Sequence, residues 1–305
     1  MNPIRAILAV TDFSAGATMA AQRAALLAAG SGAGLVLMNV VEPDAVVTLR
    51  DWFAKGRDLR AAVTEQARMQ LDAQADEIEQ RQGVRIERLV RAGRVLDEVH
   101  AASSGSDLVV LGACGERGAR EATLGTLADR LVRTADRPVL VVRRAPDRTY
   151  QRALVLTDYS TAAGAAMRAA LAVVGEGEVH LLHAFNIPFE GKLRLAGVGD
   201  EDIAAYRREM RDRVFAQMQQ ALAGAAAPDR IQPSVVPGDI RTEALRAIER
   251  LQPDLVAVGK QGESLLEDML LGSTTSHMLE HAGCDVLVVP RRASEGREEQ
   301  GEASR

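Results

Sequence analysis

The sequence predicts an α/β protein built from two tandem doubly wound domains, each a five-stranded parallel sheet in the order 3-2-1-4-5 with helices on both faces. Three observations support this prediction. Short apolar runs rich in Val, Leu and Ile alternate with segments of helical character, as expected for parallel strands that are covered on both faces. The whole alternation occurs twice in 305 residues, a length that suits about two domains. A glycine-rich segment follows the fourth apolar run each time.

The first half begins with a strand at Ile4–Val10 and continues with an Ala-rich helix to about Gly30, for which Ser14 is the expected N-cap. The next elements are a strand at 35–41, a long helix at 51–82, a strand at 85–90, a short helix at 95–102, a strand at 108–111, a helix at 126–135 and a strand at 139–142. The second half repeats this order. We therefore expect domains at 1–145 and 150–292, followed by a charged, disordered tail at 293–305.

Internal similarity identifies the two halves as copies of one domain. The segment Ile7–Ser14 matches Ala153–Ser160, and Val139–Val142 matches Val286–Val289. Matching segments are separated by about half of the chain, and a separation that long indicates a duplicated domain rather than a solenoid repeat. The last strand of each copy is a short apolar edge, and such edges tend to be paired. We expect the two halves to pair these edges within the chain as a pseudo-dimer, and further homodimerisation is compatible with this arrangement.

The composition argues against several classes of function. A net charge of −5 and an aromatic content of 3% argue against nucleic-acid binding. No apolar run approaches the ~18 residues of a membrane span, and Ile4–Val10 is typical of a strand rather than of a signal peptide. We therefore expect a cytoplasmic protein with neither membrane nor nucleic-acid partners. The two cysteines, Cys114 and Cys284, stand at non-equivalent positions and predict neither a disulfide nor a metal cluster.

The two glycine-rich segments share one spacing. They read Gly112-x2-Gly115-x9-Gly125-Thr126 in the first half and Gly259-x2-Gly262-x9-Gly272-Ser273 in the second. Each follows a predicted strand and ends at a hydroxyl residue that opens a helix. Glycines let backbone N–H groups converge, and a helix start carries about half a positive charge, so this segment suits a phosphate group.

The predicted strand order places the end of the first strand beside the end of the fourth, where the order reverses and ligands bind. The first strand leads into Asp12, whose counterpart is Asp158, and a carboxylate there suits the hydroxyl groups of a ribose. Each piece also has a simpler interpretation, because Asp12 is a plausible helix cap and the glycines are ordinary turn residues. The occurrence of the full combination in both halves favours a phosphate-bearing ligand.

This combination resembles the universal stress protein family, in particular its tandem two-domain members, over about 1–145 and 150–290. The resemblance implies that ATP binds, with or without Mg²⁺, as a regulatory event. It implies that Asp12 and Val40 contact adenosine in the first half, as Asp158 and Ala184 do in the second. It further implies that the glycine loops and the hydroxyl residues contact the phosphates, and that the edge strands of the two domains pair in antiparallel fashion.

Charge distinguishes the two glycine segments. From Gly112 to Thr126 the acidic and basic residues cancel, whereas three acidic residues between Gly259 and Ser273 face only Lys260, a net charge of −2. Each unbalanced charge near a polyphosphate costs roughly 0.3–1 kcal/mol. We therefore expect the first half to bind ATP more tightly.

Two weaker signals lie inside these segments. The run from His277 to His281 spells H-x-x-E-H, a zinc-protease signature. It falls in the helix that the nucleotide interpretation requires, and no convincing third ligand follows it, so we reject a metalloprotease. Cys114 lies in the first glycine segment, where a small filler is favoured over a redox residue.

The leading hypothesis from the sequence is an ATP-binding stress-response regulator. A lysine-bearing P-loop, a nucleophile elbow and a spaced acid pair are all missing from the sequence, so no catalytic residue is predicted. Two alternatives stay open: a nucleotide-independent interaction or chaperone-like module, and a slow ATPase.

Overall fold

The computed structural model describes residues 4–42, 59–114, 124–186, 190–225, 227–261 and 271–291. The first half contains β1 (Ala6–Val10), α1 (Ala15–Ser31), β2 (Gly34–Val41), α3 (Leu59–Gln82), β3 (Ile86–Ala92), α4 (Val95–Ser103), β4 (Leu108–Gly112), α5 (Thr126–Thr134) and β5 (Val139–Val142). The second half contains β6 (Arg152–Leu156), α6 (Thr161–Val173), β7 (Glu178–Phe185), α7 (Glu190–Leu195), α8 (Asp200–Leu222), the 3-10 turn η1 (Pro228–Arg230), β8 (Ile231–Pro237), α9 (Ile240–Leu251), β9 (Leu255–Gly259), α10 (Ser273–His281) and β10 (Asp285–Val289). The predicted tail at 293–305 lies outside the described residues.

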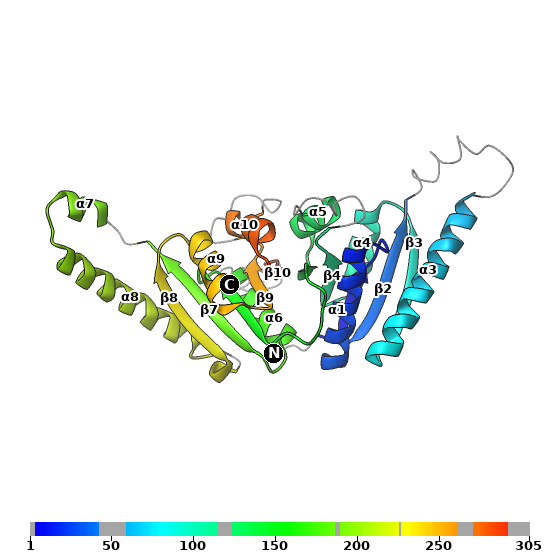
Figure 1. Cartoon of the computed structure of the whole chain (residues 1–305), viewed down its shortest axis with the longest axis horizontal. Helices are drawn as coiled ribbons and strands as arrows, with labels where there is room; N and C mark the ends of the chain where they lie inside the picture. Colours follow the sequence, from blue (N-terminus) through cyan, green and yellow to red (C-terminus); the bar gives the residue numbers. More distant parts are fainter. Residues whose placement is uncertain are drawn as a thin grey trace, which may run out of the picture.

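All the strands join one ten-stranded sheet in the order β3-β2-β1-β4-β5-β10-β9-β6-β7-β8 (Figure 1). Within each half the neighbours are parallel and the order is 3-2-1-4-5, which confirms the predicted doubly wound fold. At the centre β5 and β10 pair in antiparallel fashion, with Val141 opposite Val286 and Val139 opposite Val288. The expected pairing of the two edges within the chain is therefore confirmed, and it merges two five-stranded sheets into one.

Helices cover both faces of this sheet, and each face has its own apolar layer. Alternate side chains of a strand point to opposite faces, so Ile7 and Ala9 of β1 pack with α1 and α3, whereas Leu8 and Val10 pack on the side of α4 and α5. The second half repeats this with α6 and α8 on one face and α9 and α10 on the other. Both apolar layers run through the central strand pair, so the two halves share a continuous core.

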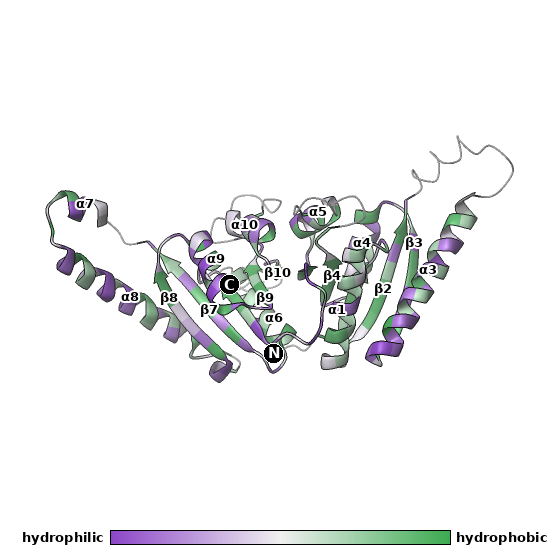
Figure 2. Cartoon of the chain, in the orientation of Figure 1, coloured by the Kyte–Doolittle hydropathy of each residue, from purple (hydrophilic) through white to green (hydrophobic). Residues whose placement is uncertain are grey.

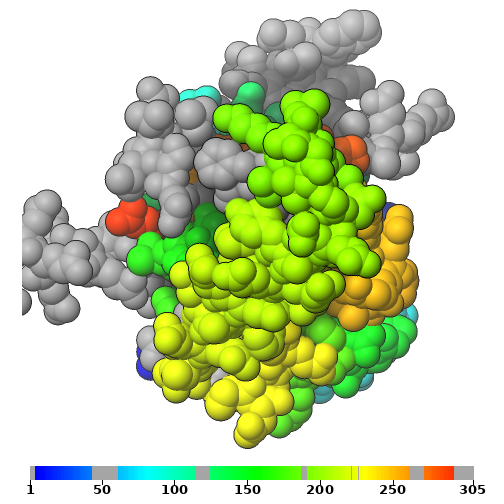
Figure 3. All heavy atoms as spheres, turned by 90° about the vertical axis from the view of Figure 1, so that its left-hand side faces the viewer, coloured from blue at the N-terminus to red at the C-terminus, as the bar shows by residue number. Residues whose placement is uncertain are grey.

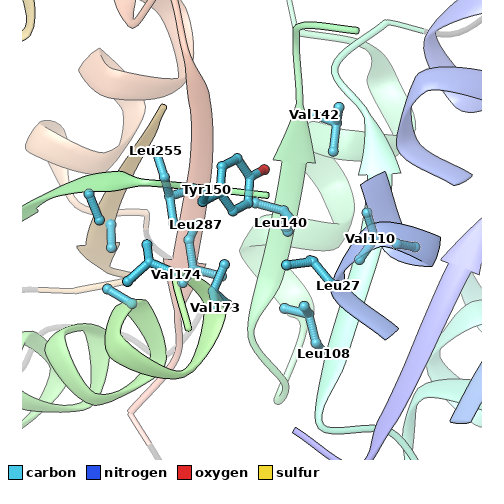
Figure 4. Close-up of a cluster of buried hydrophobic side chains, with 14 of the residues drawn as sticks. Leu27, Leu108, Val110, Leu140, Val142, Tyr150, Val173, Val174, Leu255 and Leu287 are labelled. Carbon is cyan, nitrogen blue, oxygen red and sulfur yellow. The ribbon is translucent and has the colours of Figure 1, made fainter. Parts of the chain in front are cut away.

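The layer on the side of α1 and α6 shows this continuity directly. Figure 4 shows Leu140 of β5, Leu287 of β10 and Tyr150 close together where the two halves meet, and all three side chains are buried. Figure 2 shows the complementary pattern: hydrophobic residues gather on the strands, and hydrophilic residues alternate with them along α3 and α8. Amphipathic outer helices over an apolar sheet are the pattern from which the fold was predicted.

Serine caps fix the starts of α1 and α6. The hydroxyl of Ser14 accepts a hydrogen bond from the backbone N–H of Ala17 at 3.2 Å, and the hydroxyl of Ser160 accepts one from Ala163 at 3.2 Å. This confirms Ser14 as the N-cap and repeats it in the second half. The helices therefore begin at the same point after β1 and after β6.

A buried polar cluster joins the halves beside β10. Asp285 is 1% exposed, and its carboxylate accepts hydrogen bonds from the hydroxyl of Tyr150 at 2.5 Å and from the backbone N–H of Arg143 at 2.7 Å. The Nε of Arg23 in α1 lies 3.6 Å from the same carboxylate, and its guanidinium stacks 3.9 Å over the Tyr150 ring. These contacts tie the first helix, the connecting segment and the last strand together.

The outer end of the second half is formed by α7 and α8, which cover much of the surface in Figure 3. In α7 the side chain of Leu195 is 90% exposed. None of the described helices has the length and apolarity needed to cross a membrane.

Candidate functional site

The end of strand β4 approaches the start of helix α1 so closely that a side chain does not fit between them. A Cβ atom on Gly112, the last residue of β4, would lie 2.6 Å from the carbonyl carbon of Gly16 in the first turn of α1. In the second half a Cβ atom on Gly259 would lie 2.9 Å from the Cβ of Ala162. Gly112 and Gly259 therefore allow the end of β4 and the end of β9 to lie against the start of the helix that follows β1 and β6.

The helices α5 and α10 begin close to the ends of β4 and β9. Their N-cap residues, Gly125 and Gly272, are held by hydrogen bonds from their N–H groups to the carbonyl oxygens of Ala113 at 2.7 Å and Lys260 at 3.0 Å. No side chain in the described ranges caps either helix, in contrast to the Ser-capped α1 and α6. A glycine N-cap has no side chain to accept from the first N–H groups of α5 and α10, and the helix dipole adds partial positive charge there.

The hydroxyl residues Thr126 and Ser273 are the first residues of these two helices, and both are exposed. A side chain at this position stands next to the unbonded N–H groups. Each helix start therefore offers backbone and hydroxyl donors together, which is the arrangement that binds phosphate at helix N-termini.

Asp12 and Asp158 occupy matching exposed positions just after β1 and β6. One carboxylate oxygen of each accepts a hydrogen bond from the N–H two residues later, Ser14 or Ser160, at 3.0 Å. The aspartates support the turn, while the serines cap the helices, so the simpler interpretation of Asp12 as the helix cap is wrong in detail. This turn forces the residue between them into a left-handed conformation, with φ of 64° at both Phe13 and Tyr159. Non-glycine residues adopt it at a cost and often near functional sites.

The two positions that the resemblance assigned to adenosine, Val40 and Ala184, lie near the ends of β2 and β7. In each half, the residue before this position makes a side-chain hydrogen bond from the second strand to the residue that follows the first strand. The amide of Asn39 donates to the carbonyl oxygen of Thr11 at 2.8 Å, and Nδ1 of His183 donates to that of Thr157 at 2.8 Å. Asn39 and Thr11 form this bond in the first half, and Val40 and Asp12 are the residues that follow them. The fold therefore brings Val40 and Asp12 to the same end of the sheet.

The structure therefore gathers ten of the predicted site residues at the carboxyl ends of the parallel strands, five in each half. They are Asp12, Val40, Gly112, Gly125 and Thr126 in the first half, and Asp158, Ala184, Gly259, Gly272 and Ser273 in the second. Gly115 and Gly262 lie outside the described residues. Their place in the crevice stays a prediction, as does that of the acidic residues counted in the second loop.

Comparison with known proteins assigns the chain to a family. The family model of the universal stress protein family matches residues 3–143 and again residues 149–290. The chain belongs to the universal stress protein family. Among curated relatives, universal stress protein G of Shigella flexneri is 30% identical over 115 residues, which cover 37% of this chain and 78% of that protein.

Two solved structures share this architecture. A universal stress protein from Archaeoglobus fulgidus has a TM-score of 0.65 at 19% identity and covers 94% of this chain and 98% of its own. A functionally unknown protein from Pseudomonas aeruginosa PAO1 has a TM-score of 0.62 at 18% identity, with 99% and 98% covered. At these identities the likeness establishes the fold alone. The tandem universal stress arrangement predicted from the glycine motifs is confirmed.

Sequence reasoning missed several polar residues of this universal stress protein. In the second half Tyr159 packs against His183, with ring centroids 4.5 Å apart, and burial raises the pKa of the Tyr159 hydroxyl. Lys260 is buried, and its Nζ donates across the interface to the carbonyl oxygen of Ala135, the C-cap of α5, at 3.5 Å. Spacing alone did not reveal these contacts, because each depends on an element distant in sequence.

Proposed function

We propose that this universal stress protein binds ATP as a regulatory ligand in the crevices between β1 and β4 and between β6 and β9. The observation that carries the proposal is the uncapped start of α5 or α10 beside an exposed aspartate. Main-chain donors with a positive dipole suit the phosphates, and the aspartate suits the ribose hydroxyls. No single one of these features identifies the ligand, but their repetition at the reversal point of both halves favours a nucleotide.

We further propose that the first crevice is the tighter one. The proposal rests on the charges of the two glycine segments, which cancel from Gly112 to Thr126 and sum to −2 from Gly259 to Ser273. Lys260, the basic residue counted in the second segment, is buried, and its Nζ lies 3.5 Å from the carbonyl oxygen of Ala135 in the first half.

The ligand is tested by identifying any nucleotide that leaves the purified protein on denaturation, followed by titration with ATP in the presence and absence of Mg²⁺. We expect an adenine nucleotide in the released fraction and saturable ATP binding. Asp12→Asn is the sharp variant, because the amide oxygen still accepts the hydrogen bond from Ser14 while the charge on the ribose side is lost. Asp158→Asn is its matched control in the second crevice. Binding that is absent with every nucleotide tested would refute the proposal.

An interaction module that works without nucleotide is the second candidate. One observation favours it: Leu195 of α7 is 90% exposed on the outer end of the second half, and an apolar residue so placed suits a partner surface. Partner capture that is unchanged by ATP and lost in Leu195→Glu would favour this function instead. The cytoplasmic location and any hydrolysis of ATP stay predictions.

A further inference from the structure

Two histidines stand one turn apart on α10, behind the start of the second crevice. The ring centroids of His277 and His281 are 4.4 Å apart, with their planes at 61°. Residues four apart lie on the same face of a helix, so Ser273, His277 and His281 form one stripe along α10. His277 is half-buried, and the His281 side chain is 51% exposed, so the pair is open to solvent on one side.

Charged groups of both signs surround the pair. Glu280 lies beside His281, with 3.7 Å between its carboxylate and Nε2 of that ring, and Asp239, the N-cap of α9, acts electrostatically on His277. Arg241 is the nearby positive group, and its guanidinium is paired with Asp239 at 3.2 Å. Burial, together with the imidazole of His281 and the charge of Arg241, lowers the pKa of His277.

We propose that His277 and His281 chelate one divalent transition-metal ion of the Zn²⁺, Ni²⁺ or Cu²⁺ class, each through one ring nitrogen. Two histidines at this spacing on one helix face are the arrangement by which helices bind zinc, and imidazole suits all three ions. In the described part of the chain no third His, Cys, Asp or Glu completes a cluster, so water fills the remaining positions. The site holds metal without the closed ligand set of a structural zinc centre.

This site is independent of nucleotide binding and of any Mg²⁺ that accompanies ATP, because Mg²⁺ prefers oxygen ligands. It is also confined to the second half. Aligning Thr126 with Ser273 places Arg130 and Thr134 of α5 where α10 has His277 and His281. The chain contains five histidines, and these two alone are four residues apart, so the remaining three serve as internal controls.

The test is calorimetric titration of the full tag-free chain with Zn²⁺ at pH 7.5, repeated with Ni²⁺, Cu²⁺ and Mg²⁺. The half-buried thiol is first removed by Cys114→Ser, since a thiol also binds these metals. We expect one Zn²⁺ per chain and no binding of Mg²⁺. Two histidines on one helix bind the same ion more tightly than either does alone. Removing one by His281→Ala should therefore weaken Zn²⁺ binding about a hundredfold. His100→Ala, in α4, should leave it unchanged.

His281→Ala is the primary variant because its side chain is exposed and its loss leaves the packing of α9 and α10 intact. His277→Ala is the second variant, with the same expected loss. The proposal is overturned if the wild-type chain takes up none of the three transition metals at millimolar concentration. Uptake that persists in both histidine variants, or that disappears in His100→Ala, overturns it equally, because the ligands would then lie elsewhere.

Discussion

The crevices of the first and second halves share one backbone frame but differ in side chains. Both have an aspartate turn with a left-handed residue, a Ser-capped first helix and a fourth-strand helix that begins at a glycine N-cap. On that frame Phe13 is replaced by Tyr159 and Asn39 by His183, and the replacement keeps the same cross-strand hydrogen bond. The comparison teaches that the hydrogen-bond pattern was kept while the residues supplying it changed.

The halves differ more where they meet. After β4 comes Ala113, whereas after β9 comes Lys260, whose side chain reaches the C-cap of α5. The carboxylate of Asp285 anchors the interface, and its counterpart in the first half is Pro138. The pseudo-twofold symmetry is thus broken at the interface by buried polar contacts. The second half contributes the buried charged residues Asp285 and Lys260 to these contacts, and the first half is proposed to bind ATP more tightly.

The largest expected effect is a loss of stability when Asp285 is removed from the interface between the halves. Asp285→Ala leaves the buried Arg23 guanidinium and the Tyr150 hydroxyl without their partner, and breaking such a buried pair costs about 3–5 kcal/mol of the free energy of unfolding. Denaturant unfolding followed by circular dichroism measures the loss. Asp147→Ala is the control, because its side chain is 78% exposed and should change stability by less than about 0.5 kcal/mol. Equal effects of the two variants would contradict the role given to Asp285.

The next effect tests which crevice dominates binding. Thr126→Asp places a negative charge at the start of α5, where it suits the helix dipole but repels a phosphate by about 3 kcal/mol, or about a hundredfold in ATP affinity. Ser273→Asp is the matched change in the second half. We expect the first variant to remove the tighter event of an ATP titration and the second to remove the weaker one. The opposite assignment would show that charge in the glycine segments does not rank the two crevices.

A third comparison concerns the close approach at the strand ends. Gly112→Ala pushes a methyl group against the backbone of α1, whereas Gly259→Ala meets first the methyl group of Ala162. Overpacking of this kind costs about 1–3 kcal/mol, and the clash is closer at Gly112, 2.6 Å against 2.9 Å at Gly259. We expect thermal unfolding to show the larger loss for Gly112→Ala. A larger loss for Gly259→Ala would mean that the second crevice is the more rigid one.

The smallest effect tests the shared hydrogen-bond pattern. His183→Asn should cost no more than about 1 kcal/mol in stability, because Asn39 makes the same bond to the preceding strand in the first half. His183→Ala leaves the carbonyl oxygen of Thr157 without this donor and should cost more. If the Asn variant is as unstable as the Ala variant, then the ring contact with Tyr159, rather than the hydrogen bond, is what His183 contributes.

Much of the fold was predictable because it depends on local patterns that occur twice. The apolar runs from Ile4–Val10 to Val286–Val289 predicted the strands, and the match between the halves predicted the duplication. The strand order followed from the doubly wound fold class, and the edge pairing from the short apolar last strand of each half. The helix α7 was not predicted, because its short sequence after β7 has the composition of a solvated loop. The long helix predicted at 51–82 is described from Leu59 onward.

The site was predictable only in part. Glycine spacing and the position of Asp12 indicated the crevice, because backbone geometry demands particular residues there. The contacts of Lys260 with α5 and of Asp285 with Tyr150 and Arg23 were not predictable, because they join residues more than a hundred positions apart and follow no repeat. Asymmetry between duplicated halves therefore has to be found in the structure.

The central claim is that the triphosphate of ATP binds in the crevice proposed between β1 and β4. The most direct measurement is a crystal structure of the full chain grown with saturating ATP and Mg²⁺. The account predicts ATP in the first crevice, with its phosphates at the start of α5 and its ribose at Asp12. A structure in which both crevices are empty, or in which ATP lies away from the starts of α5 and α10, would contradict it.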